Sequence, residues 1–444
     1  MNKFILLATI VKIVIMLGFF LNAAALLTWM ERRQSAMMQD RVGPNRADIN
    51  FGDTKITLAG TLHVVADTIK FFFKEDFVPP GADKFLHGLA PCLSMFPPLV
   101  LAAVIPFTDT LCVSALHGHL LTPLPRFGVC GGASGDGIPP ISGQIADLNV
   151  GILYIFALAG MGIIGATIAG WSSDNKWSLF GGLRAASQLV SYEVAMGLSL
   201  VGALMVFGSI RLGDIAHWQD ENVWGIFVQP LGFILFVTAL VAETKRVPFD
   251  LPEGESEIVA GYLVEYSGVK FMMFYTGEYL EFIVASALVV AIYLGGYNVP
   301  FLHRDGITIE LGGTVFAHHA LPHLTVLLLQ TITFFGKLAF ICWAQMFIRW
   351  TLPRFRYDQL MNLGWRMLLP AALANIFLTG AILLGLDRLG PDTAEKLKTL
   401  GEVINAGVFL VIIFGVLALI FGFFAPITRK VRRLPTHEST ADAA

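Results

Sequence analysis

Long apolar runs separated by short polar segments make up most of the chain. A helix needs about 20 consecutive apolar residues to cross the hydrocarbon core of a bilayer. Runs of this length predict about nine spans, at roughly 4–29, 88–112, 147–170, 187–208, 224–242, 279–297, 322–348, 366–386 and 403–424. We therefore expect an all-α, polytopic transmembrane helical bundle that forms a single transmembrane domain over residues 1–444.

The segment 61–76 (TLHVVADTIKFFFKED) has a different pattern. Its apolar residues recur at helical spacing, but Asp67, Lys70 and Lys74 interrupt them. The segment is too polar to cross a bilayer, and this pattern is typical of an amphipathic helix that lies in the membrane interface. We expect such a helix on the cytoplasmic side.

Composition and charge distribution support a membrane protein and give it an orientation. Charged residues are 14% of the chain, against about 25% in soluble domains. With the N-terminus outside, the cytoplasmic segments hold 21 Lys and Arg residues and the external segments hold seven. Because Lys and Arg favour the cytoplasmic side, we expect a multi-pass protein of a bacterial inner (cytoplasmic) membrane. Its tail, residues 425–444, then lies in the cytoplasm.

The external loop 113–146 is rich in Gly and Pro, which is typical of a connector. Cys112 and Cys130 flank part of it on the oxidising side, so either a disulfide or two free thiols is compatible with the sequence. No nucleotide-binding loop, CxxC metal pair or cofactor fingerprint is recognisable. We therefore expect no metal site, no covalently bound cofactor, no redox centre and no nucleic-acid partner for this chain.

The acidic loop 243–278 is the least lipid-like part of the sequence. Pro248 and Pro252 prevent a plain helix there. Carboxylates are costly against lipid, and irregular backbone at membrane depth persists only inside protein or around water. We expect this loop on the cytoplasmic side, folded back into the bundle and carrying the function. Its acids are Glu243, Asp250, Glu253, Glu255, Glu257, Glu265 and Glu278.

Two charges that fall inside predicted spans are further candidates for function. Glu193 lies about two turns, or 10 Å, into its span. Lys337 lies near the middle of another span, and is either a structural countercharge or part of a proton route. The basic and aromatic segment 349–366 (RWTLPRFRYDQLMNLGWR) is, taken alone, typical of a membrane anchor.

The chain contains the stretches ERR (31–33), RVGPN (41–45), ADTIKFFFKED (66–76), AGWSSDNKWSLFGGLRAASQLVSYE (169–193), ETKRVPFDLPEGESEIVAGYLVEYSG (243–268) and TLPRFRYDQLMNLGW (351–365). Together they resemble the H subunit of respiratory complex I, the proton-pumping NADH:quinone oxidoreductase. The resemblance covers about residues 15–370. Two parts depart from that family, namely the longer external loop and a ninth span beyond the usual eight-helix core.

The resemblance implies a subunit that forms part of a quinone chamber, for ubiquinone or menaquinone, and couples quinone reduction to proton translocation. Peripheral partner subunits would carry FMN and the iron–sulfur clusters, and small membrane subunits would lie alongside. The family's acidic coupling network falls on Glu193, Glu243, Glu253, Glu255, Glu257, Glu265 and Glu278, with Lys337 added from its position in the span. Its quinone-binding positions fall on Glu31, Arg32, Asp67, Lys70 and Arg246.

The physical chemistry of clustered acids fits this role. Carboxyl groups a few ångströms apart in a low dielectric cannot all ionise, so their apparent pKa values spread and some approach neutrality. Two other functions are compatible with the same residues. One is an H-like subunit of a membrane-bound hydrogenase, and the other is a proton-coupled secondary transporter, although the Gly and Pro breaks are not matched between the two halves of the chain.

Overall fold

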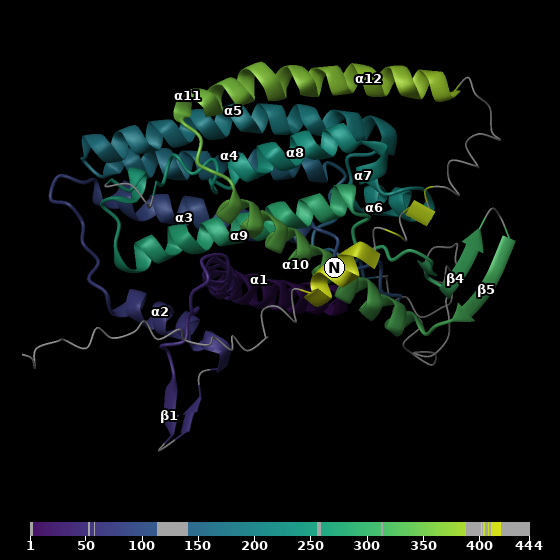
Figure 1. Ribbon diagram of the computed structural model, residues 1–444, viewed down its shortest axis with the longest axis horizontal. Helices are drawn as coiled ribbons and strands as arrows, with labels where there is room; N and C mark the ends of the chain where they lie inside the picture. The colour runs from purple at the N-terminus through teal and green to yellow at the C-terminus, as the bar shows by residue number, and fades with distance from the viewer. Residues whose placement is uncertain are drawn as a thin grey trace, which may run out of the picture.

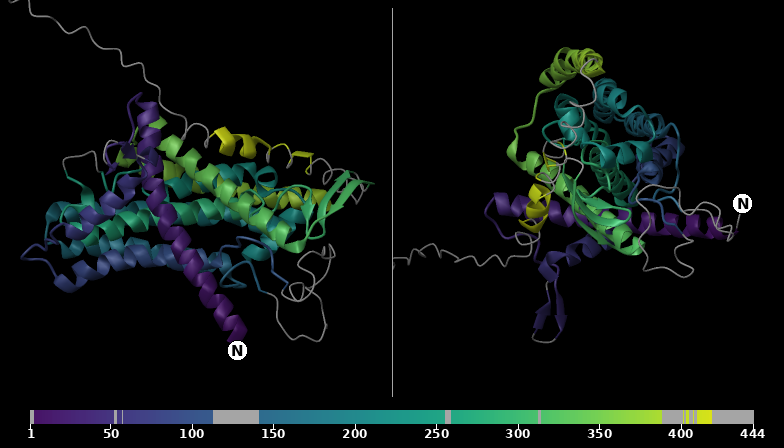
Figure 2. Two further views of the ribbon diagram at one scale, coloured as in Figure 1. Left: turned by 90° about the horizontal axis from the view of Figure 1, so that it is seen from below. Right: turned by 90° about the vertical axis from the view of Figure 1, so that its right-hand side faces the viewer.

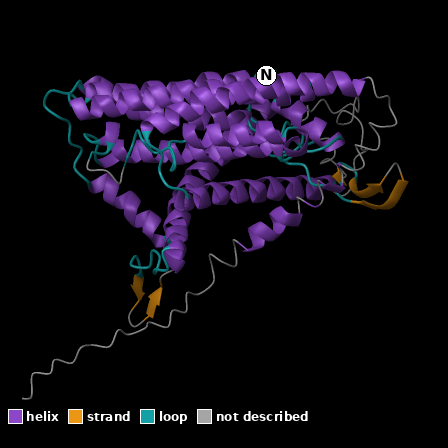
Figure 3. Ribbon diagram, turned by 45° about the horizontal axis from the view of Figure 1, so that its top comes forward, coloured by secondary structure: helices purple, strands orange, loops and turns teal. Residues whose placement is uncertain are grey.

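The computed structural model describes residues 3–51, 54–56, 58–112, 141–254, 259–311, 314–387, 401, 403–404, 407 and 410–418. Long helices lying side by side make up most of this part of the chain (Figures 1 and 3). Within it, seven helices are long and apolar enough to cross a membrane. The chain is thus a multi-pass membrane protein with an all-α bundle, as its hydrophobic pattern predicts.

The long helices occupy most of the predicted spans. One of them, α1, crosses the others obliquely (Figure 2). The last is preceded by the short helix α11 (Tyr357–Asn362) and by the π-helical turn η5 (Leu363–Leu368). The seven are α1 (Lys3–Met38), α3 (Lys84–Leu101, extended by the 3-10 turn η2, Ala102–Val104), α4 (Gly151–Ser172), α5 (Lys176–Phe207), α9 (Gly268–Tyr293), α10 (His323–Thr351) and α12 (Leu369–Asp387).

The predicted span 224–242 is wrong as a single helix. It is divided into α7 (Gly225–Val228) and α8 (Pro230–Glu243). Gln229 between them has φ −133° and ψ 61°, because a residue before proline is kept out of the helical region. The 14 residues of α8 extend only about 21 Å at 1.5 Å per residue. This helix therefore ends within the bundle, where the acids of the following segment begin.

Two small β-sheets lie outside the predicted elements. The first pairs β1 (Ile49–Phe51) with β2 (Thr54–Ile56), beside the 3-10 turn η1 (Leu58–Gly60) and α2 (Leu62–Phe73). The second has the antiparallel order β3 (Leu302–His303), β4 (Gly306–Leu311), β5 (Thr314–Ala320), with an irregularity at Ile309/Glu310. It lies at the opposite end of the molecule from α2, as does the short helix α6 (Leu212–Glu221) (Figure 1).

The helix α9 forms the centre of the core. In its apolar part 78% of the residues are buried by the rest of the chain, a larger share than in the other six long helices. Close approach to α3 depends on Gly277, where an added Cβ would lie 3.1 Å from the backbone oxygen of Ser94. This packing brings the first half of α9 next to α1 and to the segment that follows α8.

The described parts of the connecting segment 244–267 fold back into the bundle, as its prolines and acids predict. Phe249, Asp250 and Glu253 are all buried, and Tyr262 in the 3-10 turn η4 (Gly261–Leu263) is 1% exposed. The side-chain nitrogen of Gln188 donates to the backbone oxygens of Ala242 and Phe249 at 3.0 and 2.9 Å. Irregular backbone is thus satisfied by protein groups.

Several boundaries differ from the predicted ones. Because α9 begins at Gly268, Glu278 lies within a helix and not in a loop. Because α5 begins at Lys176, Glu193 lies deeper in its helix than expected. Of the ninth span, residues 410–418 are helical and Ile412 is buried. The predicted tail 425–444 and most of the external loop 113–146 lie outside the described residues, and so does Cys130, whereas Cys112 is disulfide-bonded.

Candidate functional site

A cluster of compensating charges forms where α1, α9 and α10 meet the connecting segment. We call Glu31, Arg246, Glu278, Tyr279 and Arg349 the Glu31 cluster. Arg246 donates from Nη1 to Glu31 Oε2 at 2.8 Å, and its Nε lies 2.7 Å from Glu278 Oε1. Tyr279 donates to the same Glu31 oxygen at 2.5 Å, and Arg349 forms an ion pair with the other one. One carboxylate is therefore held by three donors from three parts of the chain.

The guanidinium of Arg246 is enclosed as well as paired. Its side chain is 5% exposed, and its Cζ lies 4.3 Å from the ring centroid of Tyr279 and 5.2 Å from that of Phe282. Burial alone lowers the pKa of Arg246, but the carboxylates of Glu278 and Glu31 raise it well above its usual value. The residue is thus a permanent cation bridging two carboxylates, which suits the planar guanidinium.

The connecting segment adds a second group of charges beside the first. Burial raises the pKa of Asp250 to about 6, although Arg354 donates to its carboxylate at 2.8 Å. Burial also raises the pKa of Glu253, which accepts a hydrogen bond from Tyr262 at 2.6 Å. Burial lowers the pKa of Lys245, but nearby carboxylates, Glu253 among them, raise it above its usual value.

A polar cavity of about 10 Å³ lies between these two groups. It is lined by Lys245, Arg246, Val247, Asp250, Glu253, Tyr275, Glu278 and Arg349. A space of this size holds about one water molecule and needs polar partners to do so, which these side chains provide. The cavity is too small for a quinone ring, so these residues do not enclose a complete quinone site within the chain.

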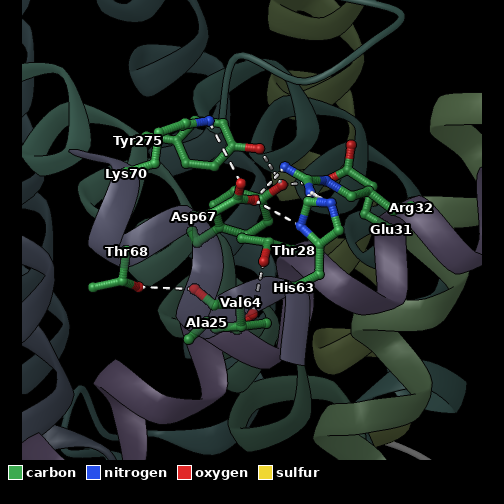
Figure 4. Close-up of polar contacts among 11 residues, drawn as sticks. Ala25, Thr28, Glu31, Arg32, His63, Val64, Asp67, Thr68, Lys70 and Tyr275 are labelled. Carbon is green, nitrogen blue, oxygen red and sulfur yellow. Dashed lines mark hydrogen bonds and ion pairs between the residues drawn. The ribbon is translucent and has the colours of Figure 1, made fainter. Parts of the chain in front are cut away.

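A separate ion-paired group joins α1 to α2. Arg32 pairs with Asp67 at 2.6 Å, and His63 Nδ1 lies 3.2 Å from the same carboxylate and 2.5 Å from Arg32 Nη1. Lys70 approaches Asp67 at 3.5 Å. Figure 4 shows these four side chains together, with Glu31 and Tyr275 in the same view. The arrangement brings Arg32, Asp67 and Lys70 together and adds His63, which sequence reasoning missed.

A further group consists of three carboxyl groups, one each from α5, α8 and α9. Glu243, the last residue of α8, is 5% exposed, and neither of its oxygens has a hydrogen-bond partner in the described structure. Glu193 and Glu281 are close enough to act on it electrostatically. Glu243 and Glu281 border a cavity of about 50 Å³ whose other lining is almost entirely apolar. A buried carboxyl without a partner is costly unless it is protonated or meets water.

The remaining predicted site residues lie elsewhere. Glu265 accepts a hydrogen bond from Asn175 at 2.7 Å and is partly exposed. Glu255 and Glu257 lie outside the described residues. Lys337 is 1% exposed and donates to the backbone oxygens of Leu294, Gly296 and Asn298, at 2.7, 3.1 and 2.7 Å. It caps the end of α9 that is far from the Glu31 cluster, and its ammonium lies 4.3 Å from the Trp224 ring centroid.

Sequence reasoning missed several members of these groups. Glu281 lies inside the predicted span 279–297, and it follows Glu278 by three residues, a spacing that places both on one face of a helix, so its position in a span was the signal that could have identified it. Arg349 has an ordinary local explanation as part of a membrane anchor. Tyr279 carries no sequence signal of its own. Among the described residues, no cluster of three or more His, Cys, Asp or Glu side chains has a geometry that could hold a metal ion.

Comparison with known proteins agrees with the resemblance in the sequence. The family model described as NADH dehydrogenase matches residues 11–380. An H subunit of the NADH-quinone oxidoreductase of Cytophaga hutchinsonii is 40% identical over 357 residues, covering 80% of this chain and 91% of the relative. The corresponding protein of Geobacter metallireducens is 40% identical over 373 residues, covering 84% and 95%. That of Flavobacterium psychrophilum is 41% identical over 357 residues, covering 80% and 91%.

Proposed function

The chain belongs to the NADH dehydrogenase family, whose members include the H subunits of NADH-quinone oxidoreductases, and we propose that it forms one wall of a quinone chamber and couples quinone reduction to proton movement. The observation that carries this proposal is the pair of charge groups at the connecting segment. On one side the ions are paired, and on the other Glu243 is buried without a partner among the described residues.

The quinone-facing side of this proposal rests on Glu31, Arg32, Asp67, Lys70 and Arg246. A quinone is a neutral ring with two carbonyl acceptors, and its reduction to quinol adds two electrons and two protons, so negative charge develops on its oxygens. Cations and hydrogen-bond donors near such a ring stabilise the developing negative charge. Because the polar cavity holds about one water, the ring would lie outside it, between this chain and a peripheral subunit that completes the chamber.

The proton side rests on Glu193, Glu243 and Glu281, together with Glu253 and Glu278. Carboxyl groups this close share fewer charges than there are groups. A new negative charge near Glu278 would be felt at Glu281, one helical turn away, and then at Glu243, which lines the same cavity as Glu281. Protons would be taken up or released as the charge changes. The relatives' names, all of quinone oxidoreductases, favour this function over a hydrogenase subunit or a transporter.

The orientation belongs to the same proposal. The positive residues favour a connecting segment, an α2 and a C-terminal tail on the cytoplasmic side of a bacterial inner membrane, with the N-terminus outside. The partners would then be the peripheral quinone-reducing subunits, which carry the redox cofactors, and neighbouring small membrane subunits.

The test is proton translocation per NADH oxidised, measured together with the quinone reductase rate in reconstituted complex. We expect Glu243→Gln and Glu193→Gln to assemble and bind quinone, but to lose rate and pumping together. A matched control is Glu221→Gln, an exposed acid at the end of α6, which should leave both unchanged. If both variants pump at the wild-type rate and ratio, these carboxyl groups are structural and the proton side of the proposal fails.

A further inference from the structure

His87, in the first turn of α3, is a buried histidine that the coupling groups above do not include. Its side chain has no exposed surface, and neither ring nitrogen has a hydrogen-bond partner among the described residues. The ring lies face to face with that of Tyr266, with centroids 4.1 Å apart and planes 5° from parallel. Buried polar groups are nearly always hydrogen-bonded. A histidine in this position therefore needs an explanation beyond packing.

Tyr266 is part of the last stretch of the connecting segment, which contacts neighbouring elements through several side chains. Tyr266 contacts the hydroxyl of Ser172 at 3.3 Å. Ser267 donates to the backbone oxygen of Glu75 at 2.6 Å, and Lys270 pairs with Asp76 at 3.0 Å. The His87–Tyr266 stack is another of these contacts. Of the side chains that make them, that of His87 is the one that ordinarily changes charge between pH 5 and 8.

The charged groups around His87 come from three elements. Lys270 lies at the start of α9, Asp76 lies in the connection between α2 and α3, and Glu265 lies in the connecting segment, and each acts electrostatically on the ring. The neighbouring parts of α4 and α5 contribute alanines to the adjacent core, namely Ala166, Ala169 and Ala185. An added charge on the ring would thus be repelled by one cation and attracted by two carboxylates.

We propose that His87 is a positioning residue: its neutral ring holds residues 259–270 against α3, and its protonated ring releases them. An imidazolium carries two N–H donors. Among the described residues the backbone of Glu265 is the one hydrogen-bonding group that acts on the ring, so in the observed position at least one N–H would be buried without an acceptor. The cation–π attraction of the imidazolium to the Tyr266 ring offsets that cost only in part. The ring would leave the stack to reach Glu265 and Asp76. The end of the connecting segment would then loosen at acid pH.

Hydrogen–deuterium exchange of peptides covering 259–270 tests this in the purified complex. Exchange is followed from pH 5.0 to 7.5 and corrected for the intrinsic pH dependence of the amides. In the wild type we expect exchange to rise about fivefold below pH 6, because local opening becomes easier. In His87→Phe, which keeps an aromatic ring and cannot titrate, the rise should disappear. The control His319→Phe changes an exposed histidine on β5 and should keep it.

Two results would overturn the proposal: a wild type without the rise, or His87→Phe with a rise of the same size. The wild-type result decides even if His87→Phe fails to assemble, and Tyr266→Leu then serves as the second variant, with raised exchange at every pH. The effect on turnover rests on the proposed function. If the acid-dependent rise in exchange is lost in His87→Phe while the pH profile of quinone reduction is unchanged, His87 still positions residues 259–270, but a role of this contact in turnover is excluded.

Discussion

Arg246→Lys is the sharpest perturbation of the Glu31 cluster, because it keeps the charge and changes only how it is distributed. The guanidinium reaches Glu31 and Glu278 at once, at 2.8 and 2.7 Å. A lysine ammonium is a compact point charge that cannot reproduce this fork. It would pair with one carboxylate and leave the other buried without its partner. The stacking on Tyr279 would be lost as well.

The size of the effect follows from the lost contact. A hydrogen bond to a charged group contributes about 1.5–3 kcal/mol, and about 1.36 kcal/mol corresponds to a tenfold change in rate. A loss of about 2 kcal/mol in the coupled transition state would therefore slow NADH-dependent reduction of a short-chain quinone about 30-fold. NADH oxidation by a hydrophilic acceptor, which bypasses the membrane part, should stay near the wild-type rate.

Arg211→Lys is the matched control. Arg211 also faces two carboxylates, Asp147 and Asp214, but on the surface, where its side chain is 38% exposed. Exposed ion pairs contribute about 0–1 kcal/mol, so this variant should reduce quinone at nearly the wild-type rate. Wild-type kinetics in assembled Arg246→Lys would refute the reasoning and remove Arg246 from the site. An equal loss in both variants would point to a general effect of the substitution.

Three further predictions concern individual side chains. Glu257→Ala and Glu265→Ala should assemble normally yet strongly lower quinone reductase activity, and absence of the assembled complex from the membrane would show a structural role instead. Lys337→Met removes three hydrogen bonds to backbone oxygens, which contribute about 3 kcal/mol in all. It should therefore lower the amount of assembled complex, while the remaining complex translocates protons at the wild-type ratio per NADH. A changed ratio in stable complex would contradict this. Asp250→Asn should alter activity at pH 7.5 but not at pH 5.5. Burial raises the pKa of Asp250 to about 6, so the wild-type carboxyl is protonated at the lower pH and resembles the amide. An equal effect at both pH values would contradict this assignment.

The sign for stability follows from the same pKa. The folded protein keeps a proton on Asp250 between pH 3.8 and about 6, whereas the unfolded chain has lost it. Stability contributed by this group is therefore highest at acid pH and falls as the pH rises through that window. Above it, the pair with Arg354 offsets part of the cost of the buried charge.

The fold class could be predicted from hydrophobic run length, because a helix that crosses a bilayer needs a run that nothing else in the sequence imitates. The finer elements could not. In α9 the early residues FMMFYTGE (271–278) are mainly apolar, but they directly follow the acidic segment, which favours a loop, whereas the structure places them in the helix. The β4 and β5 hairpin has short alternating stretches that run-length reasoning passes over.

The sequence identifies which residue types belong to the candidate site, but not which residues contact one another there. Buried acids and bases in an apolar chain stand out individually, as Glu31 and Arg246 do. Their contact joins positions 215 residues apart, and no local pattern specifies it. Arg349 and His63 illustrate the limit, because each has an ordinary local explanation. Arg349 becomes a site candidate only through its contact with Glu31, and His63 through its contact with Arg32.

The contrast between the two charge groups bears on how coupling would run. In the Glu31 cluster two carboxylates face two guanidinium groups, so its formal charges balance. Glu193, Glu243 and Glu281 have only Lys245 as a nearby cation among the groups that act on Glu243, so at most some of them can be ionised together. The balanced group is suited to sensing a new charge, and the unbalanced group is suited to holding a proton. Because Glu278 and Glu281 lie one turn apart on α9, the helix that carries the sensing group also carries the proton-holding group. We therefore expect substitutions at Glu281 to uncouple proton transfer from quinone reduction more than substitutions at Glu31, which should slow both together.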